Sequence, residues 1–363
     1  MNHSDKNIII FIPNGFGDIV MLHPTLLKIL ENKKIKKILL IVKSESHASL
    51  LGSLVPSPKI NYYSFNSENK KISNLLTLFL KLYFFKSKLI FAPLLSNKAS
   101  NKIFFALMFK KLITPNNSKK NSKSKKALHN FLGHQVNYYV NFFEDIISDK
   151  VNNDIKFSDY HLWDRTKNKE EYIVINMVSG FNEMHKIPTS NYFIELINKI
   201  HIETDYTVKS YCFDNEREYL ENIHNAINCK DKLHIINNPN LSTIKGLISG
   251  ASGGICGTTG QGHIMALSDI PIIVLSGVTE ALESGPYSKN INILKHNLEC
   301  SPCYQESFRF GCGKVHCMNG INQDLIITDL RLIKTNNFPS FDWKQSKKKP
   351  VIISKILKIH ATN

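Results

Sequence analysis

Short apolar runs alternate along the chain with longer stretches in which apolar residues recur every three or four positions. Ile8–Ile12 is a continuous apolar run rich in β-branched residues and predicts a buried parallel strand, and Lys37–Val42 predicts a second one. Between them, Pro13–Asp18 predicts a turn and Ile19–Asn32 a helix. A strand, a helix and a strand in this order form the repeating unit of a doubly wound α/β sheet.

The second half of the chain repeats this alternation after a polar stretch, Asn152–Glu171, that is typical of a linker. Strands are expected at Tyr172–Asn176, Val208–Phe213, His234–Ile236, Gly253–Cys256 and Ile270–Leu275, and helices at Asn191–Ile202, Glu216–Ile227, Leu241–Ser249 and from His263 onward. We therefore expect an α/β protein with two Rossmann-like domains, residues 1–165 and 166–335. A tail, residues 336–363, is expected to end in an apolar helix and to pack back on the N-terminal domain.

The charge balance adds an expectation about partners. The net charge is +16, and the stretch 69–143 is rich in Lys, interleaved with Phe and Leu, and contains no Asp or Glu. Such a surface favours an anionic partner, here an anionic membrane surface, although a Lys-rich composition alone also explains the charge. No apolar run has the length of a signal peptide or a membrane span, so we expect a cytoplasmic protein. The basic stretch 69–143 adds the expectation that it lies peripherally on the inner face of the inner membrane.

Candidate chemistry begins in the loop after the first strand. Asn14, Gly15 and Gly17 permit a tight turn and a close approach of the backbone to a ligand, and Asp18 follows at the mouth of the sheet. A carboxylate there is able to accept a proton from a substrate hydroxyl. The alternative is an Asp that only caps the following helix.

Two further loops follow strands in the second half. Thr258, Thr259, Gly260 and His263 lie where a strand gives way to a helix, and this arrangement is typical of an anion site or of a capped loop with a core histidine. Lys186 follows another strand, where it either reaches a diphosphate as a point charge or remains solvated.

Four cysteines lie close together in the sequence, at Cys300, Cys303, Cys312 and Cys317. Thiolates at this spacing suit a structural zinc or iron ion, and the alternatives are free thiols or a labile disulfide.

In order and spacing, these segments resemble glycosyltransferase family 9, the lipopolysaccharide heptosyltransferases. The resemblance covers about residues 5–50 and 170–322 and rests on Gly17-Asp18, Ser179-Gly180, Lys186-x-Pro188, Gly260-x-x-His263, Gly277, Gly285-Pro286 and the cysteine segment 300–317. It implies a GT-B fold of two Rossmann-like domains and an inverting sugar transfer from a nucleotide-diphosphate donor, ADP-heptose by default, to a lipopolysaccharide core or related glycan.

The resemblance also implies roles for individual residues. Asp18 matches the family's general base, and Lys186, Thr259, Gly260 and His263 match positions that hold the donor diphosphate without a catalytic metal. An acidic residue after the strand Val208–Phe213 often contacts the nucleotide ribose; Glu216 is our first choice and Asp214 the second. The chain departs from the family pattern at Thr258, where an Asp is usual, and at Ile187, where a Trp is common.

Two other classes of function stay open at this point. One is a nucleotide-sugar epimerase on the same fold, which needs no acceptor. The other is a non-enzymatic basic protein that binds a membrane or nucleic acid, although motifs for specific nucleic-acid binding are absent from the sequence.

Overall fold

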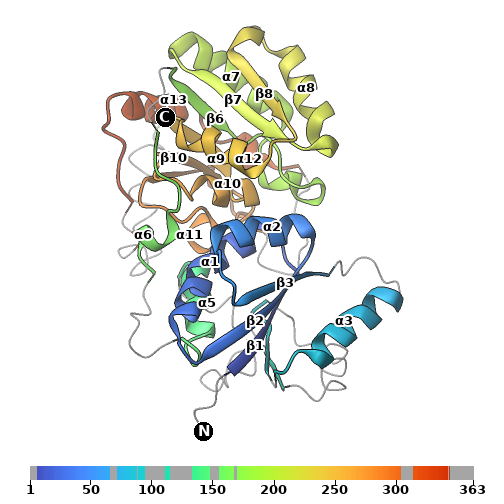
Figure 1. Cartoon of the computed structure of the whole chain (residues 1–363). Helices are drawn as coiled ribbons and strands as arrows, with labels where there is room; N and C mark the ends of the chain where they lie inside the picture. The colour runs from blue at the N-terminus through green and yellow to red at the C-terminus, as the bar shows by residue number, and fades with distance from the viewer. Residues whose placement is uncertain are drawn as a thin grey trace. The chain divides into compact units, whose positions relative to one another are not determined.

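The computed structural model describes residues 6–65, 72–87, 89–94, 111–114, 133–147, 155–166, 170–303, 314–341 and 343. The chain forms two compact units, Met1–Lys156 and Phe157–Asn363 (Figure 1). The segment expected to join the domains belongs in part to the second unit. Backbone N–H groups of Leu162 and Trp163 donate to the carbonyl of Leu267, and that of Thr166 donates to Ser249.

The first unit contains a parallel sheet with strand order β3-β2-β1-β4-β5, in which every pair is parallel. Its elements are β1 (Lys6–Ile12), α1 (Phe16–Glu31), β2 (Ile35–Val42), α2 (Glu45–Leu54), β3 (Ile60–Ser64), α3 (Ile72–Phe84), β4 (Leu89–Phe91), β5 (Lys111–Ile113) and α5 (Gln135–Phe142). Strand β1 is the central strand of the sheet. It pairs in parallel with β2, and α1 connects the two, so the expected strand–helix–strand unit is confirmed.

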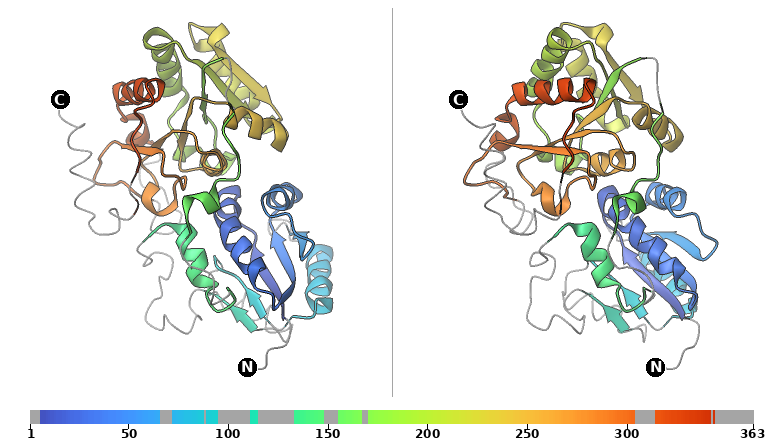
Figure 2. Two further views of the ribbon diagram at one scale, coloured as in Figure 1. Left: turned by 60° about the vertical axis from the view of Figure 1, so that its left-hand side comes forward. Right: turned by 90° about the vertical axis from the view of Figure 1, so that its left-hand side faces the viewer.

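Strand β1 is buried on both faces, which explains its unbroken apolar sequence. Ile9 and Phe11 belong to a core cluster with Leu78 and Leu82 of α3. Alternate residues of a strand point to opposite faces, so Ile8, Ile10 and Ile12 face the other side. There α1 and α5 lie side by side (Figures 1 and 2).

The second unit contains a six-stranded parallel sheet with order β11-β10-β9-β6-β7-β8. Its strands are β6 (Tyr172–Ile175), β7 (Thr207–Cys212), β8 (Leu233–Asn237), β9 (Gly253–Gly257), β10 (Ile272–Ser276) and β11 (Ile291–Lys295). Its α-helices are α6 (Phe157–Tyr160), α7 (Ser190–Glu203), α8 (Arg217–Ala226), α9 (Leu241–Ser249), α10 (Gly260–Met265), α11 (Ala281–Ser284), α12 (His316–Asn319) and α13 (Gln323–Lys334). Strand β6, the first of this sheet in sequence, pairs with β7 on one side and with β9 on the other. This is the strand order of a Rossmann sheet.

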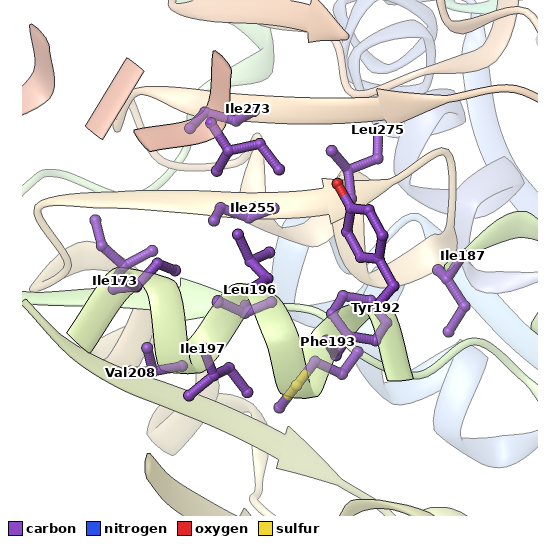
Figure 3. Packing of buried hydrophobic residues seen from close by; sticks show 14 of the residues in the cluster. Ile173, Ile187, Tyr192, Phe193, Leu196, Ile197, Val208, Ile255, Ile273 and Leu275 are labelled. Carbon is purple, nitrogen blue, oxygen red and sulfur yellow. The ribbon is translucent and has the colours of Figure 1, made fainter. Parts of the chain in front are cut away.

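The main core cluster of the second unit is formed by strands of this sheet and by helices α7, α8 and α13. Phe193, Leu196 and Ile197 of α7 are fully buried and pack against Ile173 and Ile255 of the sheet (Figure 3). The spacing of three and four between the buried positions of α7 produces this apolar stripe.

The start of the C-terminal tail packs on the second unit. Trp343 is buried, its indole N–H donates to the carbonyl of Ser288 at 2.7 Å, and its ring contacts Tyr287. The backbone N–H of Phe341 donates to Lys289. The expected docking of the tail helix on the N-terminal domain concerns residues 351–359, which lie outside the described residues.

Within the described ranges, no helix combines the length and the apolar character that crossing a bilayer requires.

The buried stripe of α7 predicts the effect of one substitution. Phe193→Ala should lower the free energy of unfolding by about 3–5 kcal/mol, because it removes a fully buried ring and leaves a cavity. Urea unfolding followed by circular dichroism measures the loss. Ile202→Ala on the same helix is the control: that side chain is 79% exposed, and its removal should change stability by less than about 0.5 kcal/mol. Equal losses in both variants would contradict the assigned core.

Candidate active site

The second unit brings several polar residues to one point on the carboxyl edge of its sheet. Asn176 follows β6, and Thr258 and Thr259 follow β9, the two strands at which the strand order reverses direction. Ligands of open α/β sheets bind at this switch point, outside the carboxyl ends of the strands.

Gly257 brings the loop of Lys186 against this edge. A Cβ at Gly257 would lie only 2.6 Å from the backbone oxygen of Lys186 and 3.1 Å from the side chain of Ile187. Such a short contact with backbone means that only glycine fits between strand and loop. The Lys186 loop, a 3-10 helix over Phe181–Lys186, is therefore held directly beside the Thr258-Thr259 turn.

Lys186 is not a solvated surface lysine. Its side chain is only 11% exposed, and its ammonium group lies 2.8 Å from the carboxylate of Glu183. A ligand with two or more negative charges is able to compete with Glu183 for this cation, because ion pairs with phosphate are strengthened by multiple acceptor oxygens.

Asn176 organises the turn that opens α10. The hydroxyl of Thr259 donates to Asn176 Oδ1 at 2.8 Å, and the Asn176 amide nitrogen donates to the side chain of Gln261 and to the carbonyl of Val178. Thr259 also caps α10 by accepting from the N–H of Gly262. Its side chain therefore fixes the turn, while Gly260 begins the helix and His263 is buried in it.

Thr258, the departure from the family pattern, is paired with another hydroxyl. Its side chain forms a hydrogen bond with Thr279, which follows β10, and both residues are buried. One of the two hydroxyls donates its hydrogen to the other. The accepting hydroxyl keeps its own O–H, which is able to donate to a further acceptor. The turn thus presents a neutral donor where a carboxylate is usual.

Glu216 and Asp214, the candidates for ribose binding, both follow β7. The Glu216 carboxylate accepts from the backbone N–H of Phe213 at 3.2 Å, and burial raises the pKa of Glu216. Asp214 accepts from the side chain of Asn238. Phe213, directly before Asp214, is 42% exposed, which is unusual for a large apolar side chain and suits stacking on a planar ligand.

In the first unit, Asp18 lies in the first turn of α1. Gly15 is the N-cap residue of this helix, without a side-chain hydrogen bond, so the interpretation of Asp18 as the helix cap is wrong. Asn14 and Gly15 form the loop between β1 and α1, and Gly17 is the second residue of the helix. Asp18 is the third residue of the helix, and glycine occupies the cap position before it.

Two residues of α5 hold the Asp18 carboxylate. Gln135 Nε2 donates to Asp18 Oδ1 at 2.9 Å, and the hydroxyl of Tyr139 donates to the same oxygen at 3.4 Å. Gln135 also donates to the Tyr139 hydroxyl at 2.9 Å, which closes a triangle of hydrogen bonds. Burial, and then the charge of Asp18, raises the pKa of Tyr139 well above its usual value, so this residue remains a hydrogen-bond donor.

The cysteine segment is described only in part, because Cys312 lies outside the described residues. Cys317 is buried and packs against Gly277, Cys303 is half-buried and Cys300 is exposed. In the described part of the chain, no group of three or more His, Cys, Asp or Glu is arranged to hold a metal ion. A structural zinc or iron ion on the four cysteines stays a prediction.

Comparison with known proteins identifies the family of the chain. The family model described as glycosyltransferase family 9 (heptosyltransferase) matches residues 119–313, more than half of the chain. The chain belongs to glycosyltransferase family 9. The match contains Lys186, Glu216 and the turn from Thr258 to His263, whereas Asp18 lies before it. No curated protein matches the chain.

Solved structures of family 9 share the fold. The glycosyltransferase family 9 protein of Veillonella parvula has a TM-score of 0.63 at 14% identity, over 93% of this chain and 99% of that one. E. coli ADP-heptose lipopolysaccharide heptosyltransferase II gives 0.61 at 12% identity, over 91% and 99%. E. coli heptosyltransferase WaaC with ADP gives 0.58 at 14%, over 79% and 92%. The protein is therefore a glycosyltransferase with the α/β GT-B fold.

Sequence reasoning missed four residues of these sites. Asn176 and Phe213 were each predicted as the last residue of a strand. A polar residue such as Asn176, or an exposed aromatic residue such as Phe213, is a signal of ligand binding when it lies at the carboxyl edge of a sheet. Gln135 and Tyr139 lie in a stretch without a recognisable motif. Their spacing of four places them on one face of a helix, but nothing local indicates that this face meets Asp18.

The contact at Gly257 predicts opposite effects for two Gly→Ala substitutions. Gly257→Ala should lower the free energy of unfolding by roughly 1–3 kcal/mol, because the new methyl group meets backbone that has to move. Gly246→Ala in α9 adds a methyl group where nothing lies within 4 Å, and it should raise stability by about 0.5–1 kcal/mol. Thermal melting of both variants measures the difference. A Gly257→Ala protein as stable as the parent would contradict the close approach of the Lys186 loop.

Proposed function

We propose that this family 9 protein transfers a sugar from a nucleotide-diphosphate donor, ADP-heptose by default, to the core of a lipopolysaccharide or a related surface glycan. The observation that carries the proposal is the Lys186 loop seated on Gly257, which joins a cation and the Thr258-Thr279 hydroxyl pair at the switch point. E. coli WaaC, a structural neighbour, has been solved with ADP and with ADP-2-deoxy-2-fluoro heptose, which supports a donor of this class.

In the proposed donor complex, the diphosphate replaces Glu183 as the partner of Lys186. Lys186 offsets the negative charge that builds on the leaving diphosphate as the bond to the sugar breaks. It thereby takes the place that a divalent cation holds in metal-dependent transferases. Gly260 and Thr259 shape the turn beside the phosphates, and His263 supports it from within α10. Glu216 binds the ribose, and Phe213 offers a face for the base.

The proposed chemical step inverts the anomeric centre. Asp18 removes the proton of the acceptor hydroxyl while that oxygen attacks the anomeric carbon from the side opposite the diphosphate. The carbon–oxygen bond to the diphosphate breaks, and the nucleotide diphosphate leaves with the bonding electrons. Asn14, Gly15 and Gly17 leave room for the acceptor beside Asp18, because two of these three residues lack a side chain.

A membrane-facing acceptor fits a feature of α3. Leu78 and Leu82 pack on the sheet, while Leu76, Phe79, Leu80, Tyr83 and Phe84 are exposed. Exposed aromatic and aliphatic side chains on one helix, with Lys81 and Lys86 beside them, are suited to the headgroup region of an anionic bilayer. We propose that this surface receives the acceptor at the inner face of the inner membrane.

The donor proposal predicts a loss of nucleotide binding in Lys186→Ala. Removing one charge-assisted contact should weaken ADP binding by about 1.5–3 kcal/mol, roughly 10- to 150-fold, as measured by calorimetry. Lys199→Ala is the matched control, because Lys199 of α7 also forms ion pairs at 2.8 Å, with Glu203 of the same helix and with Asp324 of α13. Equal affinity in Lys186→Ala and the parent for ADP, UDP and GDP would place the donor elsewhere.

The base proposal predicts that Asp18→Asn lowers turnover of ADP-heptose by roughly 10²- to 10⁴-fold, because the acceptor proton then has no base. The dissociation constant for ADP should stay within twofold of the parent value, since the proposed role places Asp18 at the acceptor and not at the diphosphate. Release of ADP in the presence of acceptor measures turnover. Activity within threefold of the parent would exclude Asp18 as the base, and isomerised donor without acceptor would favour an epimerase instead.

The membrane proposal predicts sedimentation with anionic but not neutral vesicles, weakened by rising salt. Replacing Leu80 and Phe84 with Ser should reduce binding to anionic vesicles, and so should Gln at Lys119, Lys120, Lys123, Lys125 and Lys126, which lie outside the described residues. Ile202→Ser, at an exposed position of α7, is the control and should bind like the parent. Equal binding to neutral vesicles, or none to either, would contradict the proposal.

A further inference from the structure

The side chain of Gln261, the second residue of α10, is held in one orientation by a chain of hydrogen bonds. The Asn176 amide nitrogen donates to the carbonyl oxygen of Val178 at 2.6 Å and to Gln261 Oε1 at 2.5 Å. A backbone carbonyl only accepts, so the atom of Asn176 that faces Val178 must be its nitrogen. The backbone therefore decides which way the Asn176 amide points.

Asn176 in turn decides which way the Gln261 amide points. Its nitrogen donates to Gln261, so the Gln261 atom at that position must be the oxygen, Oε1. The oxygen of Asn176, at the other end of its amide, accepts from the hydroxyl of Thr259. The opposite end of the Gln261 amide is thus the Nε2 group, which has two N–H bonds that this contact does not use.

The backbone of Gln261 is also fixed in place. A Cβ at Gly262 would lie 2.6 Å from the carbonyl oxygen of Gly257 and 3.0 Å from Cys256 Sγ, so the start of α10 lies directly against the end of β9. Thr259 caps the same helix. The Gln261 side chain is half-buried, and the residue follows the two threonines at the carboxyl end of β9. A hydrogen-bond donor of fixed direction therefore lies at the switch point of the sheet.

Two other groups at this edge of the sheet are hydrogen-bond donors as well. Lys186 carries a positive charge, and the Thr258-Thr279 pair retains one O–H. A sugar hydroxyl both donates and accepts, whereas the oxygens of a diphosphate only accept. An edge that offers N–H, O–H and ammonium groups therefore suits a diphosphate oxygen better than a hydroxyl.

We propose that Gln261 binds a phosphate oxygen of the donor through Nε2, and that Asn176 is the positioning residue that turns this amide toward the ligand. The inference rests on the proposed nucleotide-diphosphate donor and deepens it, because it adds a neutral hydrogen-bond donor to the charge of Lys186. Asn176 prevents the reversed orientation, in which the Gln261 nitrogen would meet the Asn176 nitrogen and the Gln261 oxygen would meet the phosphate.

Two substitutions of Gln261 distinguish a ligand contact from a structural role. Gln261→Leu removes the phosphate contact and also deprives the buried Asn176 amide of an acceptor, so it should lower the melting temperature as well. Gln261→Glu keeps the shape of the side chain, and its carboxylate still accepts from Asn176, but its other oxygen brings a negative charge toward the phosphates.

Calorimetry with ADP measures both effects. We expect the dissociation constant to rise about 10-fold in Gln261→Leu and about 100-fold in Gln261→Glu. A residue that only supports the turn would show the reverse order, since Gln261→Glu retains the bond to Asn176. That reverse order would overturn the proposal.

Asn225→Asp is the control for charge. It also converts an amide to a carboxylate, but Asn225 is an exposed residue near the end of α8. A helix that follows a parallel strand runs back to the opposite edge of the sheet, so this position lies away from the switch point. The variant should bind ADP within twofold of the parent. A loss in Asn225→Asp equal to that in Gln261→Glu would show a general effect of charge and overturn the proposal.

NMR of side-chain amides tests the contact directly. The ¹H–¹⁵N signals of the Gln261 side chain, assigned by their loss in Gln261→Leu, should shift when ADP is added. Those of Gln323, whose Nε2 donates to the carbonyl of Tyr192, should stay in place. Unshifted Gln261 signals at saturating ADP would refute the contact.

Lys186→Ala separates this inference from the proposed function. If Lys186→Ala weakens ADP binding while both Gln261 variants bind ADP like the parent, the donor site stands and the role of Gln261 is refuted. If the parent binds none of ADP, UDP and GDP, the proposed donor class fails and the inference fails with it.

Discussion

The burial of parallel strands on both faces is the constraint on which both units of this protein depend. Strands such as β1 and β9 have no solvent-exposed face. A polar side chain along such a strand would be buried, which costs free energy unless it finds a hydrogen-bond partner. Polar groups collect instead at the carboxyl ends of the strands, where Asp18 follows β1 and Thr258 follows β9. The same rule that builds the cores therefore decides where chemistry is possible.

Much of the fold follows from the sequence because apolar runs report burial directly. The strands β1, β2, β6 and β9 and the helix α7 were predicted within a few residues, since each has a continuous run or a regular stripe. The Lys186 loop and the turn at Thr258 were also found, because glycines and hydroxyl residues after a strand are a local signal. The start of α10 lies at Gly260, earlier than expected from His263, since Thr259 is the residue that caps it.

What the sequence did not predict is contact between distant segments. Gln135 meets Asp18 across more than one hundred residues of chain, and Gly257 meets the backbone of Lys186 only after folding. The role of Asp18 illustrates the difference. Its sequence context left both a helix cap and a base open, and only the structure shows that Gly15 takes the cap position while α5 donates two hydrogen bonds to the carboxylate.

The two tryptophans of the protein make its two units distinguishable by fluorescence. Trp163 and Trp343 are the only tryptophans in the sequence, and both are buried in the second unit, which also contains the Lys186 loop. Indole emission therefore reports the second unit alone, whereas backbone dichroism reports both. Whether the two units unfold together or in sequence becomes readable in the native chain, without any label, from the difference between these two signals.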